Sequence, residues 1–119
     1  MADLEILRAY DAILASRAKD SLRHFLPLMW QVVEPGTRYR PNWHIDAMCE
    51  FLEAVSSGEI KRLVINIPPG HMKSRCVTVG WPCWEWITKP HLRYLCASYA
   101  QSLADDHNGE RRAIVKSDW

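Results

Sequence analysis

The residues Ile65-Asn66-Ile67-Pro68-Pro69-Gly70-His71-Met72-Lys73-Ser74 decide which fold the sequence predicts. The stretch begins inside a short apolar run, residues 61–67. This run is rich in β-branched side chains and is stopped by two prolines, as expected of a buried parallel strand. Residues 71–89 then most resemble a helix, with a kink expected near Gly80 because its neighbours are poor helix formers. A strand, a tight turn and a helix that opens with Lys-Ser together are typical of a phosphate-binding loop.

Such a loop binds an anion because its backbone N–H groups converge on phosphate oxygens and the helix dipole favours negative charge. Lys73 would reach the β- and γ-phosphates, and the Ser74 hydroxyl would bind Mg²⁺. The complete motif, however, has glycines where Ile67 and Met72 stand. The alternative is structural: the prolines end a strand, Gly70 makes a turn, and Lys73 and Ser74 lie at an exposed helix start.

Helical patterns surround this loop. Apolar spacing predicts a helix over residues 4–17, a second helix after a Ser21 cap that contains Pro27, and a turn at residues 34–37. A third helix is expected between the Asn42 cap and Gly58, with Met48, Phe51, Leu52 and Val55 on its apolar face.

The remainder of the chain predicts a second strand and a last helix. Residues 93–99 form the strand candidate, and residues 101–115 form a polar helix. The order of the expected elements is helices, strand, loop, helix, strand and helix. This order predicts an α/β fold, namely a partial P-loop NTPase in which a parallel sheet with flanking helices follows an N-terminal helical segment.

Composition bounds the class of protein. With 119 residues, 48% hydrophobic residues and a net charge of +1, the sequence predicts one folded unit without the strongly basic character of a nonspecific nucleic-acid binder. The absence of a signal peptide or a long apolar run indicates a soluble intracellular protein. The cysteines lack the spacing of metal ligands, so we expect them to be buried free thiols. These cysteines are Cys49, Cys76, Cys83 and Cys96.

Residues 68–74, Pro-Pro-Gly-His-Met-Lys-Ser, resemble the variant phosphate loop of tailed-phage terminase large subunits, in their N-terminal ATPase portion. Four further blocks in the same order share the likeness, which covers roughly Pro41 to Trp119. They are residues 42–55, 58–63, 81–86 and 93–100.

The resemblance implies the ATP-binding part of a motor that translocates double-stranded DNA into the viral capsid. It implies ATP and Mg²⁺ as cofactors, the portal protein and the small terminase subunit as partners, and a homo-oligomeric ring in the host cytoplasm, transiently at the capsid portal, without a membrane. The chain would then comprise a helical segment, residues 1–41, and an incomplete ATPase domain, residues 42–119, with its phosphate loop at residues 67–74. In this interpretation the domain stops before the Asp-Glu strand and the nuclease domain of the full-length family.

Site residues carry over from the same resemblance. The cradle would be formed by Pro69, Gly70, His71 and Met72. Lys73 and Ser74 would bind the phosphates and magnesium. Trp43 and His44 would form the adenine-side motif. For Trp43, packing in the helix core is the competing interpretation.

Two departures bear on activity. Gly70 stands where many terminases have arginine, so either another arginine supplies that charge or hydrolysis is impaired; Arg75 is expected to face solvent. No apolar strand ending in Asp-Glu follows Ser98, and Asp105-Asp106 reads as helix surface. We therefore expect no catalytic residues and no hydrolysis by this chain alone. A non-catalytic prophage remnant and another P-loop NTPase are the alternatives.

Overall fold

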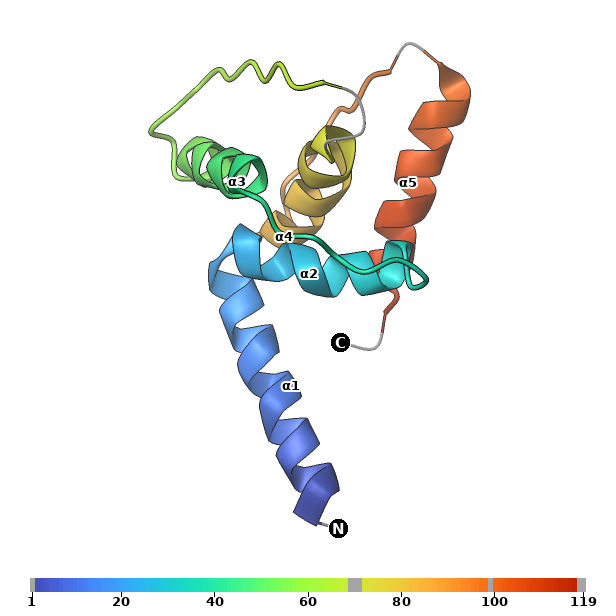
Figure 1. The fold of residues 1–119 in the computed structure, drawn as a ribbon. Coiled ribbons are helices and arrows are strands. Elements are labelled where there is room, and N and C mark those ends of the chain that lie inside the picture. The colour runs from blue at the N-terminus through green and yellow to red at the C-terminus, as the bar shows by residue number, and fades with distance from the viewer. Residues whose placement is uncertain (1, 69–71, 99, 118–119) are drawn as a thin grey trace.

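The computed structural model describes residues 2–68, 72–98 and 100–117, and every regular element in these ranges is helical. Figure 1 shows one helix projecting from a body that the others form. In chain order the elements are α1 (Ala2–Asp20), α2 (Leu22–Val33), α3 (Trp43–Ser56), the π-helix η1 (Arg75–Gly80), α4 (Trp81–Thr88) and α5 (Gln101–Val115).

The expected α/β fold with a parallel sheet is wrong, because the described ranges contain no strand. Within those ranges, residues 61–68 and 92–98 instead run as connections between helices and form no strand (Figure 1). Leu63, Ile65 and Ile67 pack against the core while Val64 is 83% exposed, so the side chains do alternate as in an extended chain. A strand also needs a neighbour for its N–H and C=O groups, whereas a helix satisfies them internally.

α2 is the centre of the core. Leu22, Phe25, Leu26 and Met29 are all buried, which confirms the apolar spacing expected for this helix. Pro27 does not end the helix, which continues to Val33, because the φ angle that proline imposes is itself helical. Each of the other described helices contributes at least one buried residue to the same cluster, and α3 contributes four.

The starts of α2 and α3 are stabilised differently. At α3 the Asn42 side chain accepts a 2.7 Å hydrogen bond from the backbone N–H of Trp43, which confirms the expected cap. At α2 the Ser21 side chain makes no capping bond, and the Leu22 N–H donates instead to Glu53 Oε1 at 2.8 Å. A carboxylate from α3 thus serves the start of α2, where the helix dipole favours negative charge.

A continuous helical segment contains η1 and α4. It begins with Lys73 and Ser74, passes through the π-helix and ends at Thr88, so a π-helical stretch occupies the region where we expected a kink. A Cβ atom at Gly80 would lie 2.7 Å from Leu26 Cδ2 and 3.0 Å from Met29 Sδ. Glycine therefore allows this segment to lie close against α2.

The tryptophans of α4 attach the other parts of the fold. Their indole N–H groups donate to three different acceptors: Trp81 to Ser56 Oγ at 2.8 Å, Trp84 to the Ala18 carbonyl at 3.0 Å, and Trp86 to the Leu92 carbonyl at 2.9 Å. Each bond joins α4 to another segment, namely α3, α1 or the connection after α4. The three tryptophans of α4 are therefore packing residues of the fold.

Candidate nucleotide site

Of the phosphate loop, residues 67–74, the structure describes residues 67–68 and 72–74, while Pro69, Gly70 and His71 lie outside the described residues. Met72 has φ 63°, the left-handed region that favours glycine, and is the only non-glycine residue with positive φ in the described ranges. Its carbonyl accepts a 2.9 Å hydrogen bond from the Cys76 N–H, which starts the helix. Met72 thus has a backbone conformation that favours glycine, at a position where the complete motif has one.

Lys73 and Ser74 form the first helical residues after Met72, and both are exposed. Within residues 2–68, 72–98 and 100–117, no carboxylate forms an ion pair with the Lys73 ammonium. The Ser74 side chain makes no capping hydrogen bond. The first N–H groups of a helix lack intrahelical partners, so this end of the helix offers donors and positive charge to an anion.

A cavity of about 440 Å³ lies beside Met72. Asn42 and His44, at the start of α3, line it together with Met72, although they are far apart in the sequence. Arg38 and Arg40, from the connection between α2 and α3, line it as well. The structure therefore brings the end of the predicted phosphate loop and one half of the predicted adenine-side motif to the same cavity.

The charge of this cavity favours an anion. Its described lining residues include two arginines and no aspartate or glutamate. Guanidinium groups form charge-assisted, often bidentate hydrogen bonds with phosphate oxygens. We did not identify Arg38 and Arg40 as site residues from the loop motif, because nothing in the motif links residues 38–40 to Met72. The only available signal was the local density of positive charge.

Trp43 does not join His44 in the cavity. Its side chain is 78% exposed, so the alternative of a helix-packing core residue is wrong. It lines a separate cavity with Arg23 and Asp46, and its ring meets that of His44 edge-on at 6.2 Å between centroids. Trp43 is not among the residues that line the cavity beside Met72.

Arg75 is not solvent-facing, contrary to expectation. Its guanidinium lies 2.7 Å from Glu34 Oε1 and 3.2 Å from Glu110 Oε1, and its Cζ lies 5.0 Å from the centre of the Trp30 ring. Burial lowers the pKa of Arg75, but the hydrogen bonds and charges of the two carboxylates outweigh this effect and raise the pKa overall. Arg75 is thus committed to the fold and does not replace the arginine absent at Gly70.

The acidic residues after Ser98 remain on the surface. Asp105 and Asp106 are exposed on α5, and Asp105 Oδ1 accepts a hydrogen bond from Gln101 Nε2 at 2.9 Å, which confirms that pair as helix surface. In the described ranges no three His, Cys, Asp or Glu side chains gather as metal ligands would. None of the helices in these ranges combines the length and hydropathy needed to cross a bilayer.

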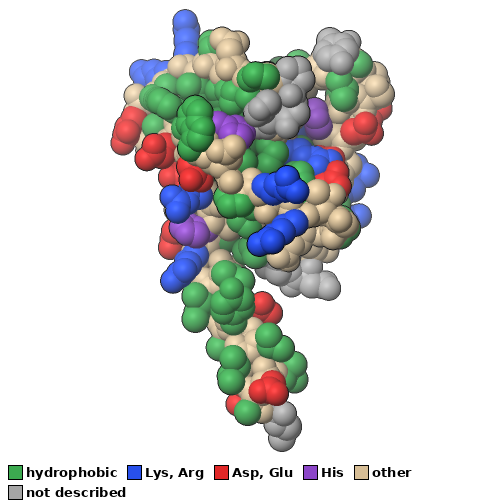
Figure 2. Space-filling view, viewed as in Figure 1, with side chains coloured by type: hydrophobic (Ala, Val, Ile, Leu, Met, Phe, Trp, Pro, Cys, Tyr) green, Lys and Arg blue, Asp and Glu red, His purple; other side chains and the backbone are tan. Residues whose placement is uncertain are grey.

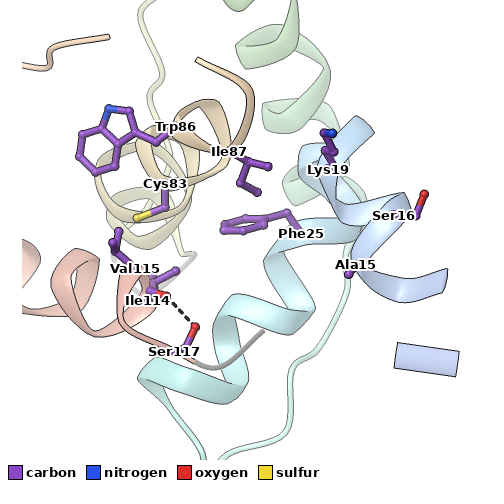
Figure 3. Close-up of a pocket in the computed structure, with 10 residues that line it drawn as sticks. All are labelled: Ala15, Ser16, Lys19, Phe25, Cys83, Trp86, Ile87, Ile114, Val115 and Ser117. Carbon is purple, nitrogen blue, oxygen red and sulfur yellow. Dashed lines mark hydrogen bonds between the residues drawn. The ribbon is translucent and has the colours of Figure 1, made fainter. Parts of the chain in front are cut away.

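A second cavity, of about 560 Å³, lies between α1, α2, α4 and α5 (Figure 3). Its lining is mainly apolar, and it contains none of the site residues predicted from the loop motif or carried over from the resemblance. Lys19 and Ser16 are at its α1 side, while Phe25, Cys83, Ile87 and Ile114 form much of the remainder. The side chains that line it are packing residues, and they include no converging set of charged groups.

The cavity beside Met72 is therefore the part of the described structure where a left-handed turn, a helix start and two arginines come together. Lys73 and Ser74 follow that turn directly, and His44 provides a ring that can donate or accept hydrogen bonds. Comparisons of the chain with protein-family models, with curated proteins and with solved structures give no match.

Proposed function

We propose that the chain binds ATP with Mg²⁺ in the cavity beside Met72. The observation that supports this most directly is the shared lining of that cavity by Met72, Asn42 and His44. Sequence blocks that resemble the phosphate loop and the adenine-side motif of terminases thus meet at one place. The proposal does not depend on a sheet, because the groups that contact the ligand come from a helix start and a connection between helices.

Each residue has a distinct role in the proposed complex. The N–H groups at the start of the helical segment and the Lys73 ammonium bind the β- and γ-phosphates, while the Ser74 hydroxyl binds Mg²⁺. Arg38 and Arg40 supply the positive charge that Arg75 cannot, since Arg75 is held by Glu34 and Glu110. The resemblance assigns the remainder of the cradle to Pro69, Gly70 and His71, which lie outside the described residues.

In the larger proposal, this nucleotide site belongs to a DNA-packaging motor of the terminase large-subunit type. The multi-block sequence resemblance supports it. In that setting the partners are double-stranded DNA, the portal protein, the small terminase subunit and further copies in a ring, at the capsid portal in the host cytoplasm. A second candidate is a non-catalytic remnant that binds nucleotide only, and it is favoured because residues 61–68 and 92–98, where the two strands were expected, form no strand in the described ranges.

The nucleotide proposal is tested by titrating the chain with a fluorescent ATP analogue in the presence of Mg²⁺. We expect saturable binding that Lys73→Ala weakens roughly tenfold or more, because a charge-assisted hydrogen bond to phosphate is lost. Arg38→Ala and Arg40→Ala should each weaken it several-fold. Lys61→Ala is the matched control, since Lys61 is exposed and does not line the cavity. Equal binding by the wild type and Lys73→Ala would remove Lys73 from its role, and no binding at millimolar nucleotide would refute the site.

Turnover provides an independent test. The exposed Asp105 and Asp106 lie on the surface of α5, and neither lines the proposed cavity. We therefore expect no phosphate release above background from ATP and Mg²⁺ with this chain alone. Sustained release that Lys73→Ala abolishes would show that the chain contains a hydrolytic group that we have not identified.

A further inference from the structure

The N-terminal part of α1 presents an apolar surface that the rest of the chain does not cover. Residues 2–13 are all exposed, and Figure 2 shows hydrophobic side chains along the projecting helix. Leu7 and Tyr10 are each 58% exposed, and Ile6 is 65% exposed. A monomeric protein seldom leaves several large apolar side chains exposed along one helix without a partner for them.

The sequence of this helix is self-complementary about Tyr10. Leu7 and Ile13 lie three positions on either side of it, and Ile6 and Leu14 lie four positions on either side. Seven positions away, Asp3 precedes it and Arg17 follows it. Residues 3, 7, 10, 14 and 17 also have the alternating four-and-three spacing of a coiled-coil seam.

Ile6, Leu7, Tyr10, Ile13 and Leu14 form an apolar stripe along α1. This stripe points away from the body to which α1 is attached. Each helical residue advances by about 100°, so Lys19 lies about half a turn around the helix from Tyr10. Lys19, Ala15 and Ser16 line the cavity between α1 and the body (Figure 3), and Ala18, which is fully buried, lies about 80° around the helix from Tyr10, so the body flanks the C-terminal end of the stripe and leaves Ile6, Leu7 and Tyr10 clear. Arg17 remains exposed, and Leu14 is half-buried. A second helix can therefore approach without meeting the body of the same chain.

We propose that two copies of this chain associate through α1 in an antiparallel pair centred on Tyr10. A two-fold axis at Tyr10 places Leu7 against Ile13 of the second copy and Asp3 against its Arg17, as in an isologous interface. A parallel pair would put Asp3 against Asp3 and Arg17 against Arg17. The acidic first turn and basic last turn also suit the helix dipole, but only the antiparallel orientation lets them attract each other between copies.

The apolar stripe supplies the affinity, and the charges supply the orientation. The stripe is short, so we expect a weak dimer with a dissociation constant on the order of tens of micromolar. This inference is separate from nucleotide binding, since no residue of α1 lines the cavity beside Met72. Failure of either proposal therefore leaves the other intact.

Sedimentation equilibrium of the whole chain between about 5 and 500 µM tests the proposal, at a concentration range set by that expected affinity. We expect a monomer–dimer equilibrium that Leu7→Glu abolishes without loss of helix content, because Leu7 is exposed in the monomer. A chain that stays monomeric throughout overturns the proposal and assigns the stripe to a different partner. An equilibrium that Leu7→Glu leaves unchanged also overturns it.

Charge exchange tests the antiparallel orientation. Asp3→Arg alone and Arg17→Asp alone each turn two attractive contacts into repulsive ones, so each should weaken the dimer roughly tenfold. The double variant Asp3→Arg/Arg17→Asp, or an equimolar mixture of the two single variants, should restore association. Lys61→Asp and Asp106→Arg, exposed charge changes outside α1, are the controls and should leave it unchanged. Single variants that associate as well as the wild type would overturn the antiparallel pair.

Discussion

The guanidinium of Arg75 lies 2.7 Å from a carboxylate oxygen of Glu34, so the first turn of η1 is tied to the residue that ends α2. Glu110 of α5 shares the same guanidinium group at 3.2 Å, and Trp30 of α2 lies under it. Three helices therefore meet at one side chain. The contact also fixes the position of Lys73 and Ser74, which precede Arg75 directly.

Replacing Arg75 should destabilise the fold. Arg75→Ala leaves Glu34 and Glu110 without their cation and removes the contact with Trp30, and we expect the free energy of unfolding to fall by about 2 kcal/mol. Urea denaturation followed by circular dichroism measures the change. Arg23→Ala is the control, since Arg23 and Asp46 form an exposed pair at 3.7 Å and its loss should cost about 0.5 kcal/mol or less. Similar losses for both variants would contradict a structural role for the Arg75 network.

The two glycines at positions 80 and 109 should respond in opposite directions to alanine. Gly80→Ala forces a methyl group against Leu26 Cδ2 at 2.7 Å and should lower stability by about 1–3 kcal/mol. Gly109 lies inside α5 with no atom within 4 Å of an added Cβ, so Gly109→Ala should raise stability by about 0.5–1 kcal/mol. Thermal unfolding midpoints distinguish the two. A stabilising Gly80→Ala would show that η1 does not pack closely against α2.

Glu53 should stabilise the start of α2 more than Ser21, the residue at the cap position. Glu53→Ala removes the acceptor of the Leu22 N–H and should lower the free energy of unfolding by about 1–2 kcal/mol. Ser21→Ala should have a much smaller effect, because the Ser21 side chain makes no capping bond. The comparison is made by chemical denaturation at neutral pH, and the reverse order of effects would contradict the assigned cap.

A single cysteine should react readily in the folded protein. Burial raises the pKa of Cys83 to about 12, and the Cys76 side chain and burial raise the pKa of Cys49, so neither is a thiolate at pH 8. Cys76 is fully buried, while Cys96 is exposed. A chromogenic thiol reagent should therefore modify one thiol quickly and the others only after unfolding. Cys96→Ser should remove the fast phase, and a persisting fast phase would contradict the burial of the other three.

The helices were largely predictable from the sequence because their signals are local. The spacing of Leu22, Phe25 and Met29 predicts the buried face of α2, and the Asn42 cap predicts the start of α3. α5 occupies the residues expected of it, Gln101–Val115. Phe51 is an exception, since it belongs to the apolar pattern of α3 and is 52% exposed. A pattern predicts which residues share a face but not how far the neighbouring helices extend over it.

The absence of a sheet from the described residues was not predictable in the same way. Val64 and Ile65 have strand propensity, and residues 61–68 are indeed non-helical, but propensity does not provide a hydrogen-bonding neighbour. The site shows the same limit. Lys73 and Ser74 follow from a local motif, whereas Arg38 and Arg40 reach the cavity through the tertiary arrangement, and the Arg75 network joins residues that no local pattern relates.

The indole hydrogen bonds of α4 allow the unfolding of the protein to be followed step by step. Trp81, Trp84 and Trp86 each report a different attachment, and the Trp30 N–H adds a fourth through its 2.8 Å bond to the Thr37 carbonyl. In a proton–nitrogen correlation spectrum, each indole signal would shift when its own acceptor departs. The order in which α1, α3 and the two connections detach during heating is therefore recorded in four resonances of the nitrogen-15-labelled chain.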